Sequence, residues 1–482
     1  MDEIELKLQL AEADAAKLRA SGSLPGKGRA IRQHAVYWDS PEGALAAAGM
    51  SLRIRTADPN RVQTLKTRGT SAAGLFARPE IEHPAKGERP ELPEDSPVLA
   101  VVSDAAELLP LYDVQVLRRT WDVTTGSTSI EVVLDTGTAR SGDRWSPICE
   151  LELELKKGDP KALFDLARKL DQVAPLRLGV LTKSERGTRL REAMAAAVKA
   201  EPVPLAAPMT AAEALQAILS ACIRQFRLNE DLIFPTRAPE ALHQARVALR
   251  RIRSAFSVFK PVLGTEGARD LRNRLKGLAA ELGAARDLDV LVAKAGPGPL
   301  RDRLRAERER GYDRVEAVLA SDGTRALMLD LAEWTFAGPW LEDAATRDHR
   351  QRPVRAFAAD ALKRFRRKVK KGGRNLSQLP DDARHELRKD SKKLRYAAEF
   401  FAAFYDGTSA RAHAAFLRSL EKLQDHLGTL NDLATAPVLL ERLGLAADPA
   451  AEPLRAGPDK AKVLGKAEKA HGKLMAAPRF WH

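Results

Sequence analysis

The sequence contains few cysteines, few aromatic residues and no long apolar segment. Cys149 and Cys222 are the only cysteines among 482 residues, too few for a disulfide framework, which favours a reducing compartment. No apolar run approaches the length that spans a bilayer, and the acidic start Met1-Asp2-Glu3 is unlike the basic start of a secretory signal. We therefore expect a cytoplasmic protein with no membrane partner.

Aromatic residues make up only 5% of the chain. Proteins that bind single-stranded nucleic acid commonly stack bases on aromatic side chains, and zinc fingers need regularly spaced Cys and His. The sequence shows neither a stacking platform nor such a spacing, which argues against nucleic acid as the partner. The P-loop motif GxxxxGK[ST] is also missing from the sequence.

Charge divides the chain into two parts. Residues 1–200 hold 29 Lys and Arg against 29 Asp and Glu, so the whole net charge of +14 lies in the remaining residues. A neutral part joined to a basic part predicts two domains with different electrostatic tasks, the second with a polyanionic partner.

The two parts also differ in hydrophobic period. Up to about residue 157, segments such as MSLRIRT, VQTLKTR and CELELELKK alternate polar and apolar residues, which predicts β-strands. The segment KAEPVPLAAPMT (199–210) contains three prolines, and we interpret it as an interdomain linker. Amphipathic helices are then predicted over 211–228, 239–260, 267–295, 299–320, 324–336, 352–371, 380–405, 409–430 and 432–443, before a Lys- and Ala-rich tail that forms a last helix or is partly disordered.

A histidine- and arginine-rich helical segment occurs twice. HQARVALRRIRSAF (243–256) and HELRKDSKKLRYAA (385–398) align without gaps, and each copy places basic side chains in a narrow stripe beside its apolar face. Like charges on neighbouring turns repel each other, so we interpret the stripe as a groove for a row of phosphates. The alternative to a phosphate-binding groove is that the stripe is only a solvated basic face of the helix. His243 and His385 either contact phosphate or hydrogen-bond between helices.

The repeated pattern resembles the CHAD domain, the conserved-histidine α-helical domain. The similarity covers about residues 210–445, with two copies over about 211–340 and 352–445. It implies a duplicated helical bundle that binds inorganic polyphosphate. The polyphosphate-binding residues that it implies are His243, Arg246, Arg250, Arg251, Arg253, His385, Arg388, Lys392, Lys393 and Arg395.

Alternating charges mark the strands of the first part. Side chains two apart on a strand share a face, so the charged residues of EIELK (3–7) point one way, and those of ELELELK (150–156) do the same. Each strand alone fits an ordinary solvated face, but together they predict a barrel with a charged interior. Carboxylates hold hard cations such as Mg²⁺ or Mn²⁺, while Lys and Arg neutralise phosphate oxygens. This interior therefore suits a metal–oligophosphate complex.

The arrangement resembles the CYTH family, the triphosphate tunnel metalloenzymes, over residues 1 to about 195. The motif Glu-x-Glu-x-Lys at 3–7 is followed in the family's order by LRIR (52–55), TLK (64–66), RPEIE (78–82), LDTG (134–137) and KSERG (183–187). The resemblance implies an α+β fold with a closed antiparallel β-barrel and flanking helices.

The same resemblance implies roles for individual residues. The implied metal ligands are Glu3, Glu5, Glu150, Glu152 and, as an outer member, Glu154. The implied phosphate-binding residues are Lys7, Arg53, Arg55, Lys66, Arg78, Arg118 and Lys183. The implied catalytic set is Glu3, Glu5, Lys7, Glu80, Glu82 and Glu131, the last three positioning water or metal. Between Arg118 and Arg119, the spacing to Trp121 favours Arg118 as the residue that faces the interior.

The two resemblances predict a CYTH domain over 1–198, a linker over 199–210 and an all-α CHAD domain over 211–482. A fusion of this kind resembles bacterial inorganic triphosphatases. It implies Mg²⁺- or Mn²⁺-dependent hydrolysis of tripolyphosphate to pyrophosphate and phosphate, with long-chain polyphosphate as a second partner. Two alternatives stay open: a hydrolase or cyclase that acts on thiamine triphosphate or ATP, and a non-catalytic polyphosphate-binding protein.

Overall fold

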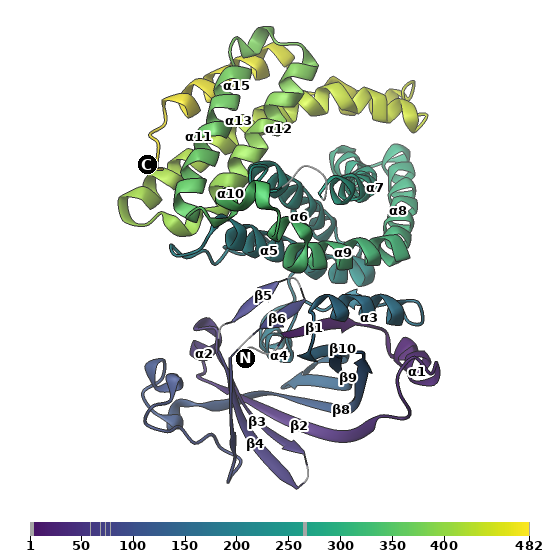
Figure 1. The fold of residues 1–482 in the computed structure, drawn as a ribbon. Helices are drawn as coiled ribbons and strands as arrows, with labels where there is room; N and C mark the ends of the chain where they lie inside the picture. Colours follow the sequence, from purple (N-terminus) through teal and green to yellow (C-terminus); the bar gives the residue numbers. More distant parts are fainter. Residues whose placement is uncertain are drawn as a thin grey trace. The chain divides into compact units, whose positions relative to one another are not determined.

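The computed structural model describes residues 4–57, 59–67, 69–72, 74–77, 79–263 and 268–481 of the chain. Two compact units are present, Met1–Ala196 with Ser321–Ala337, and Ala197–Ala320 with Gly338–His482. The first unit is built mainly from strands and the second from helices (Figure 1). Among the described helices, none is both long enough and apolar enough to cross a membrane.

The first unit is built on one antiparallel sheet (Figure 1). From edge to edge its strands are β5 (Thr70–Ala72), β6 (Leu75–Ala77), β1 (Ile4–Gln9), β10 (Arg144–Lys157), β9 (Thr128–Ser141), β8 (Leu109–Thr125), β2 (Arg29–Asp39), β3 (Ser51–Ala57), β4 (Asn60–Lys66) and β7 (Glu80–Pro84), and β11 (Arg177–Leu178) also pairs with β1. The alternating pattern of the first part therefore predicted strands correctly.

The prediction of a closed barrel is wrong for the part of the chain that the structure describes. The strand order begins at β5 and ends at β7, and within the described residues no backbone pairing joins these two edges. Both edge strands are short, with three and five residues against the 17 of β8. In addition β7 ends at Pro84, which has no N–H to donate to a further strand. The sheet is therefore an open, curled half-barrel.

Helices cover the apolar face of this sheet. They are α1 (Glu12–Ala20), α2 (Ala44–Ala47) and α3 (Lys161–Asp171), with α9 (Asp322–Ala337) packed on α3. Helix α4 (Lys183–Arg191) instead packs on the opposite, charged face, where Lys183 bonds Glu152. On β1 and β10 the apolar face consists of Leu6, Leu8, Leu151 and Leu153, each at most 1% exposed. The core side of α3, with Leu163, Phe164 and Leu170, packs against β10. Because strand residues alternate between faces, this packing turns the charged residues of the same strands to the opposite side.

Helix α9 follows residue 320 in the chain but belongs to the first unit. It packs against α3 and β11. Arg168 of α3 donates to Asp330 over 2.9 Å and pairs with Glu333. Arg325 donates to Asp171 over 2.7 Å. The helix predicted over 324–336 is thus attached by charged pairs to the helix that covers the sheet.

The second unit consists of helices in its described residues, apart from the extended segment before α5, the connecting loops and one isolated bridge. Its helices are α5 (Ala211–Thr236), α6 (Pro239–Val258), α7 (Arg269–Lys294), α8 (Pro299–Ala320), α10 (Arg347–Gln351), α11 (Val354–Gly372), α12 (Asp381–Phe400), α13 (Gly407–Arg442), α14 (Glu452–Ala456) and α15 (Lys460–Ala476). Neighbouring helices pack as α5–α6–α7–α8 and as α11–α12–α13–α15, and α6 also packs on α12. The two helices that carry the repeated basic motif therefore lie side by side.

Some predicted helix boundaries in this unit are wrong, and α5 continues to Thr236, beyond the predicted end at 228. The segments 409–430 and 432–443 are a single helix, α13, that continues through Asn431 and Pro437. The Asn431 side chain interacts with Nδ1 of His385 over 3.1 Å and so does not compete for the backbone of its own helix. The Lys- and Ala-rich tail forms the last helix, α15.

Candidate functional site

Strand register places acidic side chains in rows across β1, β10 and β9. Glu5 of β1 lies opposite Glu154 of β10, which lies opposite Glu131 of β9. In the next row of the same face, Lys7 lies opposite Glu152. These residues are far apart in the sequence, and antiparallel pairing alone brings them together. The row of three carboxylates gives this face an acidic edge, and Lys156 pairs with two of them, Glu131 and Glu154.

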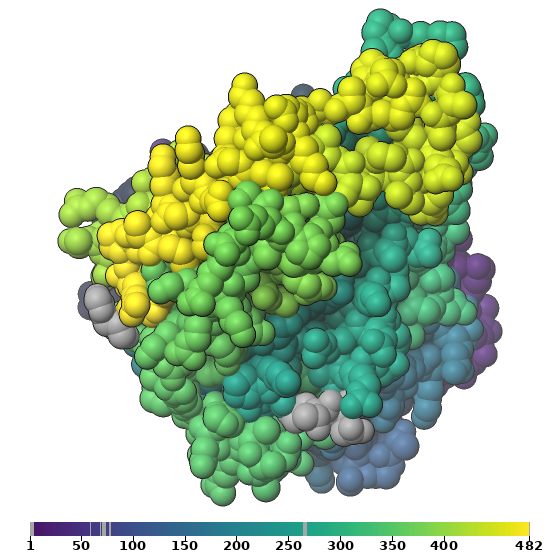
Figure 2. Space-filling model, turned by 90° about the horizontal axis from the view of Figure 1, so that it is seen from above, coloured from purple at the N-terminus to yellow at the C-terminus, as the bar shows by residue number. Residues whose placement is uncertain are grey.

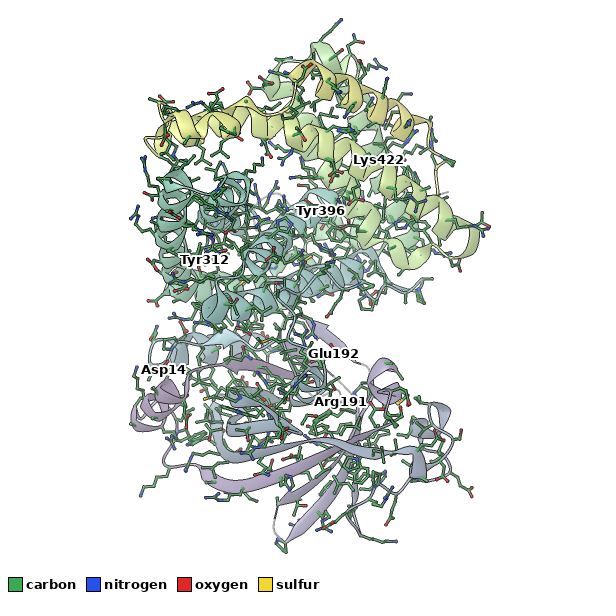
Figure 3. The ribbon with its side chains drawn as sticks, turned by 180° about the vertical axis from the view of Figure 1, so that it is seen from behind. Asp14, Arg191, Glu192, Tyr312, Tyr396 and Lys422 are labelled. Atoms are coloured by element: carbon green, nitrogen blue, oxygen red, sulfur yellow. The ribbon has the colours of Figure 1, made fainter. Side chains whose placement is uncertain are left out.

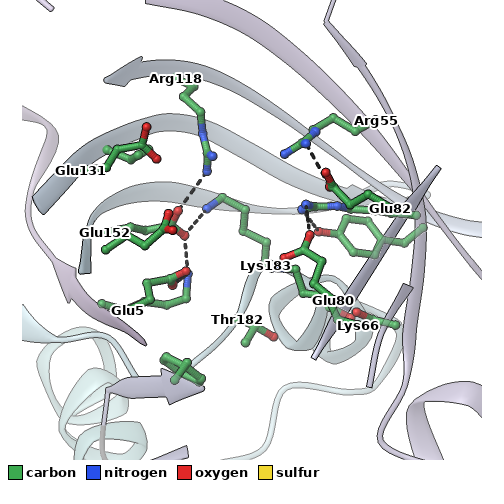
Figure 4. A pocket seen from close by; sticks show the side chains of 18 residues that line it. Glu5, Arg55, Lys66, Glu80, Glu82, Arg118, Glu131, Glu152, Thr182 and Lys183 are labelled. Carbon is green, nitrogen blue, oxygen red and sulfur yellow. Dashed lines mark hydrogen bonds and ion pairs between the residues drawn. The ribbon is translucent and has the colours of Figure 1, made fainter. Parts of the chain in front are cut away.

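These rows form one wall of a cavity of about 550 Å³ (Figure 4). Its charged lining consists of Glu5, Lys7, Arg53, Arg55, Lys66, Glu80, Glu82, Arg118, Glu131, Glu152, Glu154 and Lys183. The other lining residues are Tyr37, Ser51, Phe76, Val133, Thr182 and Ser184. The cavity is thus surrounded by carboxylates and cations from seven strands together with Lys183 from α4.

Lys183 is the centre of a buried cluster behind this wall. Its Nζ lies 2.7 Å from Oδ2 of Asp135, 2.5 Å from Oε1 of Glu150 and 2.8 Å from Oε1 of Glu152. The three carboxylates can place one oxygen each within 4.8 Å of one another. Arg118 completes the cluster with bonds to Asp135 of 2.9 and 2.6 Å and a bond of 2.9 Å to Glu152.

The charges in this cluster stabilise one another. Burial alone would lower the pKa of Lys183, but Asp135 and Glu150 outweigh it, and the pKa is raised well above its usual value. Burial would raise the pKa of Glu152, but Lys183 and Lys7 hold it well below its usual value. Glu5 differs, because burial and the neighbouring Glu152 raise its pKa more than Lys7 lowers it. Glu5 is therefore a buried carboxylate whose charge the protein alone does not fully offset.

The opposite wall pairs cations of β3 and β4 with the carboxylates of β7. Lys66 lies opposite Glu80 in the strand register and bonds it over 2.7 Å. Arg53 lies 3.6 Å from the same carboxylate, and Arg55 lies 3.2 Å from Glu82. Burial lowers the pKa of Arg55, and the adjacent Arg53 lowers it further. Two guanidinium groups on one strand face therefore repel each other when no anion lies between them.

The structure brings most of the predicted residues of the first unit to this cavity. Glu3 and Arg78 lie outside the described residues. Glu150 is only 2% exposed and lies behind the lining with Asp135. Arg118, not Arg119, lines the cavity, because Arg119 bonds the Lys27 carbonyl over 2.7 Å.

Sequence reasoning did not assign a role to Asp135, Tyr37, Thr182 or Ser184. A signal for Asp135 exists, since it lies four residues after Glu131 and shares its strand face. Thr182 begins the capping box that starts α4, with its hydroxyl accepting from the Glu185 amide. This cap fixes Lys183 in the first helical turn, where its ammonium reaches the buried cluster.

The donor set fits a hard divalent cation. The carboxylates of the lining and of the buried cluster offer only oxygen ligands, which Mg²⁺, Mn²⁺ and Ca²⁺ prefer. A divalent ion beside Glu5 would also offset the negative charge that leaves the pKa of this residue raised. A buried acidic cluster that can hold a metal ion is thus present in Asp135, Glu150 and Glu152.

In the second unit, the repeated motif forms one basic cluster, the stripe: Arg246 and Arg250 of α6 with Arg388 and Lys392 of α12. Burial, followed by the charges of Arg250, Arg388 and Arg246, lowers the pKa of Lys392 to about 6. The packing of α6 on α12 brings the cations of both copies together, so that their charges act on one another. Within the described residues, no carboxylate lies within 4 Å of the charged groups of Arg250, Arg388 or Lys392.

Histidine and acidic residues surround this stripe. Burial lowers the pKa of His243 to about 4, and the nearby Arg286 adds to the effect. Asp287 is 4.0 Å from Arg246, and Asp432 partly offsets the cations around Lys392. His385 contacts Asn431, so one of the two histidines does form a contact between helices.

The other predicted cations of the motif lie elsewhere. Arg251 is 4% exposed, lies 3.8 Å from Glu399 and stacks over the Phe400 ring at 5.2 Å. Arg395 bonds Glu399 over 2.7 Å, and Lys393 bonds Asp390 over 3.0 Å. Arg253 is half-buried and faces Arg272. Arg286, which influences His243, had no role in the sequence prediction.

Comparison with known proteins matches the first unit, which holds the cavity, and the second unit, which holds the stripe, to two different families. Family models match the CYTH domain over residues 1–188 and the CHAD domain over residues 217–441. An inorganic triphosphatase of Haemophilus influenzae is 32% identical over 155 residues, which are 31% of this chain and 44% of that protein, so the chain matches less than half of that relative.

An uncharacterized protein of Mycobacterium tuberculosis is 27% identical over 464 residues, covering 87% of this chain and 83% of that protein. The crystal structure of the CHAD domain from the plant Ricinus communis is 29% identical, covers 59% of this chain and 98% of that chain, and gives a TM-score of 0.49. Both resemblances stated from the sequence are confirmed by the family models. The chain thus contains a CYTH domain followed by a CHAD domain.

Proposed function

We propose that the first unit hydrolyses inorganic tripolyphosphate to pyrophosphate and phosphate with the help of a divalent cation. The observation that carries the proposal is the convergence of six cations and six carboxylates on one cavity. The similarity of this region to an inorganic triphosphatase supports a triphosphatase in general, and the lining supports the choice of substrate.

The cations of the cavity would hold the phosphate chain from two sides. Lys7, Arg118 and Lys183 approach it from the wall of the buried cluster, whereas Arg53, Arg55 and Lys66 approach it from the opposite wall. Guanidinium groups bind phosphate oxygens through two parallel bonds. An anion between Arg53 and Arg55 would also remove their mutual repulsion. The two walls together can therefore fix the orientation of a short chain.

The carboxylates would hold the divalent cation and the water. Glu5, Glu152 and Glu154 line the cavity beside the cluster of Asp135 and Glu150. A bound Mg²⁺ or Mn²⁺ would supply charge neutralisation and activation of water at the terminal phosphate. Our sequence prediction names Glu3 as a further ligand.

The reaction itself breaks the bond between the terminal phosphorus and its bridging oxygen. Water supplies the oxygen that the released phosphate gains, and its protons pass to the products and to carboxylates such as Glu80 and Glu82. The negative charge that develops on the departing pyrophosphate is offset by the cations of both walls. No Ser or Cys nucleophile is needed.

The uncharged lining favours an inorganic chain over an organic triphosphate. Recognition of a nucleobase or a thiamine ring usually requires an accessible aromatic or apolar face. Tyr37 already stacks on Tyr112, with ring centroids 4.8 Å apart, and its hydroxyl accepts a bond from Arg53 over 3.5 Å. The remaining apolar lining, Phe76 and Val133, is small. The alternative substrates, thiamine triphosphate and ATP, have no evident ring pocket among the described lining residues.

Phosphate release tests the proposal. The native protein with Mg²⁺ should release phosphate from tripolyphosphate faster than from ATP or thiamine triphosphate, and Glu5→Gln should lower kcat by about 100-fold or more. Glu42→Gln, at an exposed position of the same unit, is the matched control and should retain full activity. A native protein without metal-dependent release would instead support the non-catalytic polyphosphate-binding alternative.

The stripe of the second unit supports binding of long-chain polyphosphate. Three of its four described cations, Arg250, Arg388 and Lys392, lack a carboxylate within 4 Å, and Arg246 has only Asp287 at 4.0 Å. This arrangement is unfavourable unless an anion joins them. Arg246→Glu with Arg388→Glu should abolish stripe binding of long-chain polyphosphate and leave tripolyphosphate hydrolysis unchanged. Unaltered binding by this double variant would show that the stripe is only a solvated basic face.

A further inference from the structure

A second basic groove lies in the helical unit, between α13 and α15. It has a volume of about 370 Å³ and its basic lining consists of Arg418, Lys422, His426, Lys466, Lys469 and Lys473. The remaining lining is Ala415, Ser419 and Ala470. Figure 3 marks Lys422 on one wall, and Figure 2 shows the C-terminal helix, in yellow, at the surface. The α15 wall lies beyond residue 441, where the match to the CHAD domain ends.

The cations of this groove have no acidic partners. Within the described residues, no ion pair joins any of its Lys or Arg side chains to a carboxylate. Two acidic residues on the same helices have partners elsewhere, since Glu421 lies 3.6 Å from Arg395 and Glu468 accepts a bond from Ser377 over 3.4 Å. Five positive charges therefore share one hollow, and their repulsion opposes the packing of α15 on α13.

Apolar packing holds α15 in place against this repulsion. Val463, Ala467 and Leu474 are buried on its inner face, and Nε2 of His471 lies 3.1 Å from the Val369 carbonyl oxygen. A side chain at Gly373 would meet the His471 ring at 2.2 Å, so only glycine permits this approach. The groove is consequently formed before any ligand arrives, which reduces the ordering cost of binding.

We propose that the groove between α13 and α15 binds inorganic polyphosphate as a second site, separate from the stripe. Along α13 the basic side chains of Arg418, Lys422 and His426 recur every four residues, a rise of about 6 Å, and the three lysines of α15 recur every three or four. Two parallel rows of cations match a linear chain that carries negative charge along its whole length. The lining contains no aromatic side chain, so it offers no platform for the bases of a nucleic acid.

The site shares its ligand class with the proposed function of the stripe but rests on different residues and helices. Lys422→Glu with Lys469→Glu reverses one cation on each wall of the groove. Lys363→Glu with Arg367→Glu makes the same charge change at exposed positions of α11 and is the matched control. Both pairs are placed in the full chain that also carries Arg250→Glu and Arg388→Glu, so that stripe binding is removed.

The measurement is binding of long-chain sodium polyphosphate over a range of salt concentrations. The stripe variant should retain measurable binding, and the groove pair should weaken it by about tenfold at low salt, while the control pair should not. The salt slope should fall by roughly 0.7 for each lost contact, the value for single-stranded polyanions. Lys422→Gln with Lys469→Gln removes the two charges without reversing them and should cause a smaller loss of polyphosphate binding. This pair distinguishes an effect of charge from an effect of misfolding.

Three outcomes would overturn the proposal. They are the loss of all binding in the stripe variant, equal binding by the groove pair and the control pair, and equally tight binding of single-stranded oligouridylate at the groove. The last outcome would assign the groove to nucleic acid. Failure of the stripe as a binding site is a distinguishable result, because the stripe variant would then bind as tightly as the native protein.

Discussion

Lys392 should take up a proton when the stripe binds polyphosphate. In the free protein its pKa is lowered to about 6 by burial and by Arg250, Arg388 and Arg246, with Asp432 of α13 only partly offsetting them. Phosphate oxygens among these groups would reverse the effect and return the pKa toward the value of about 10.4 for an exposed lysine. At pH 8 the free side chain is neutral and the bound one is charged.

The size of this effect follows from proton linkage. Between pH 6 and the pKa of the bound state, binding is coupled to the uptake of about one proton, so affinity should fall by up to tenfold for each unit by which the pH rises. Below pH 6 Lys392 is already protonated in the free protein, and its contribution to the pH dependence vanishes. His243, with a pKa lowered to about 4, adds proton uptake only if polyphosphate raises its pKa too.

Titration calorimetry at pH 8 in two buffers with different ionisation enthalpies measures the number of protons taken up. Lys392→Arg, which keeps the charge at any pH, should bind with about one proton fewer and with a flatter pH profile. Lys392→Met should also lose the proton uptake and should bind more weakly at pH 6. Equal proton uptake by the native protein and by Lys392→Arg would refute the reasoning, since any remaining uptake belongs to the polyphosphate itself.

Three further predictions concern stability. Asp135→Asn removes a buried carboxylate between Lys183 and Arg118 and should lower the free energy of unfolding by about 3 kcal/mol in urea titrations; a loss below about 1 kcal/mol would contradict a structural role for the cluster. The pKa values of Asp135 and Glu152 are lowered in the folded state. The two ionised carboxylates therefore stabilise the fold above the ordinary carboxyl range near pH 4, and this stabilisation should disappear as the pH falls further. Acid unfolding of the native protein, compared with that of Asp135→Asn, measures the loss. Gly373→Ala should destabilise the packing of α15 by about 1–3 kcal/mol in thermal melts, because its methyl group would overlap the His471 ring, whereas Gly472→Ala, which meets no atom within 4 Å, should be neutral or stabilising.

The faces of the strands could be predicted from the sequence, whereas the closure of the sheet could not. Period-two alternation places Glu5 with Lys7 and Arg53 with Arg55 because side-chain direction on a strand is a local property. Whether β7 meets β5 depends on the lengths of distant edge strands, which alternation does not encode. Alternation also placed Asp135 on the face of Glu131, but it did not reveal its role, because its partners Lys183 and Arg118 come from two other elements.

The repeated helical motif shows the same division between local and long-range information. Helical spacing correctly placed Arg246 and Arg250 on one helix face, and Arg388 with Lys392 on the corresponding face of the second copy. It did not show that these two rows of cations face each other and form the single stripe, because this depends on the packing of α6 on α12. Arg251 belongs to the same motif but is buried against Glu399 and Phe400 of the neighbouring copy, a contact that no local pattern predicts.

The cavity and the stripe should respond to Mg²⁺ in opposite directions. Each cation of the cavity already lies beside a carboxylate, as Lys66 does with Glu80 and Lys183 with Glu152. Triphosphate alone must break these pairs and would then face the carboxylates directly, so a divalent ion that binds the carboxylates should strengthen its binding. The stripe has almost no carboxylates to neutralise, and there Mg²⁺ would compete with Arg250 and Arg388 for the phosphate oxygens.

Binding measured with EDTA and with Mg²⁺ tests this contrast. Both test proteins carry Lys422→Glu with Lys469→Glu, which removes binding at the groove. Adding Arg246→Glu with Arg388→Glu then isolates the cavity, with the non-hydrolysable imido analogue of tripolyphosphate as its ligand, whereas adding Glu5→Gln reports the stripe with long-chain polyphosphate. We expect Mg²⁺ to tighten the first complex and to weaken the second, because the same ion completes one site and shields the ligand of the other. Tight binding of the analogue in EDTA would show that the cations of the cavity are accessible without a metal and would contradict the role given to Glu5, Glu152 and Glu154.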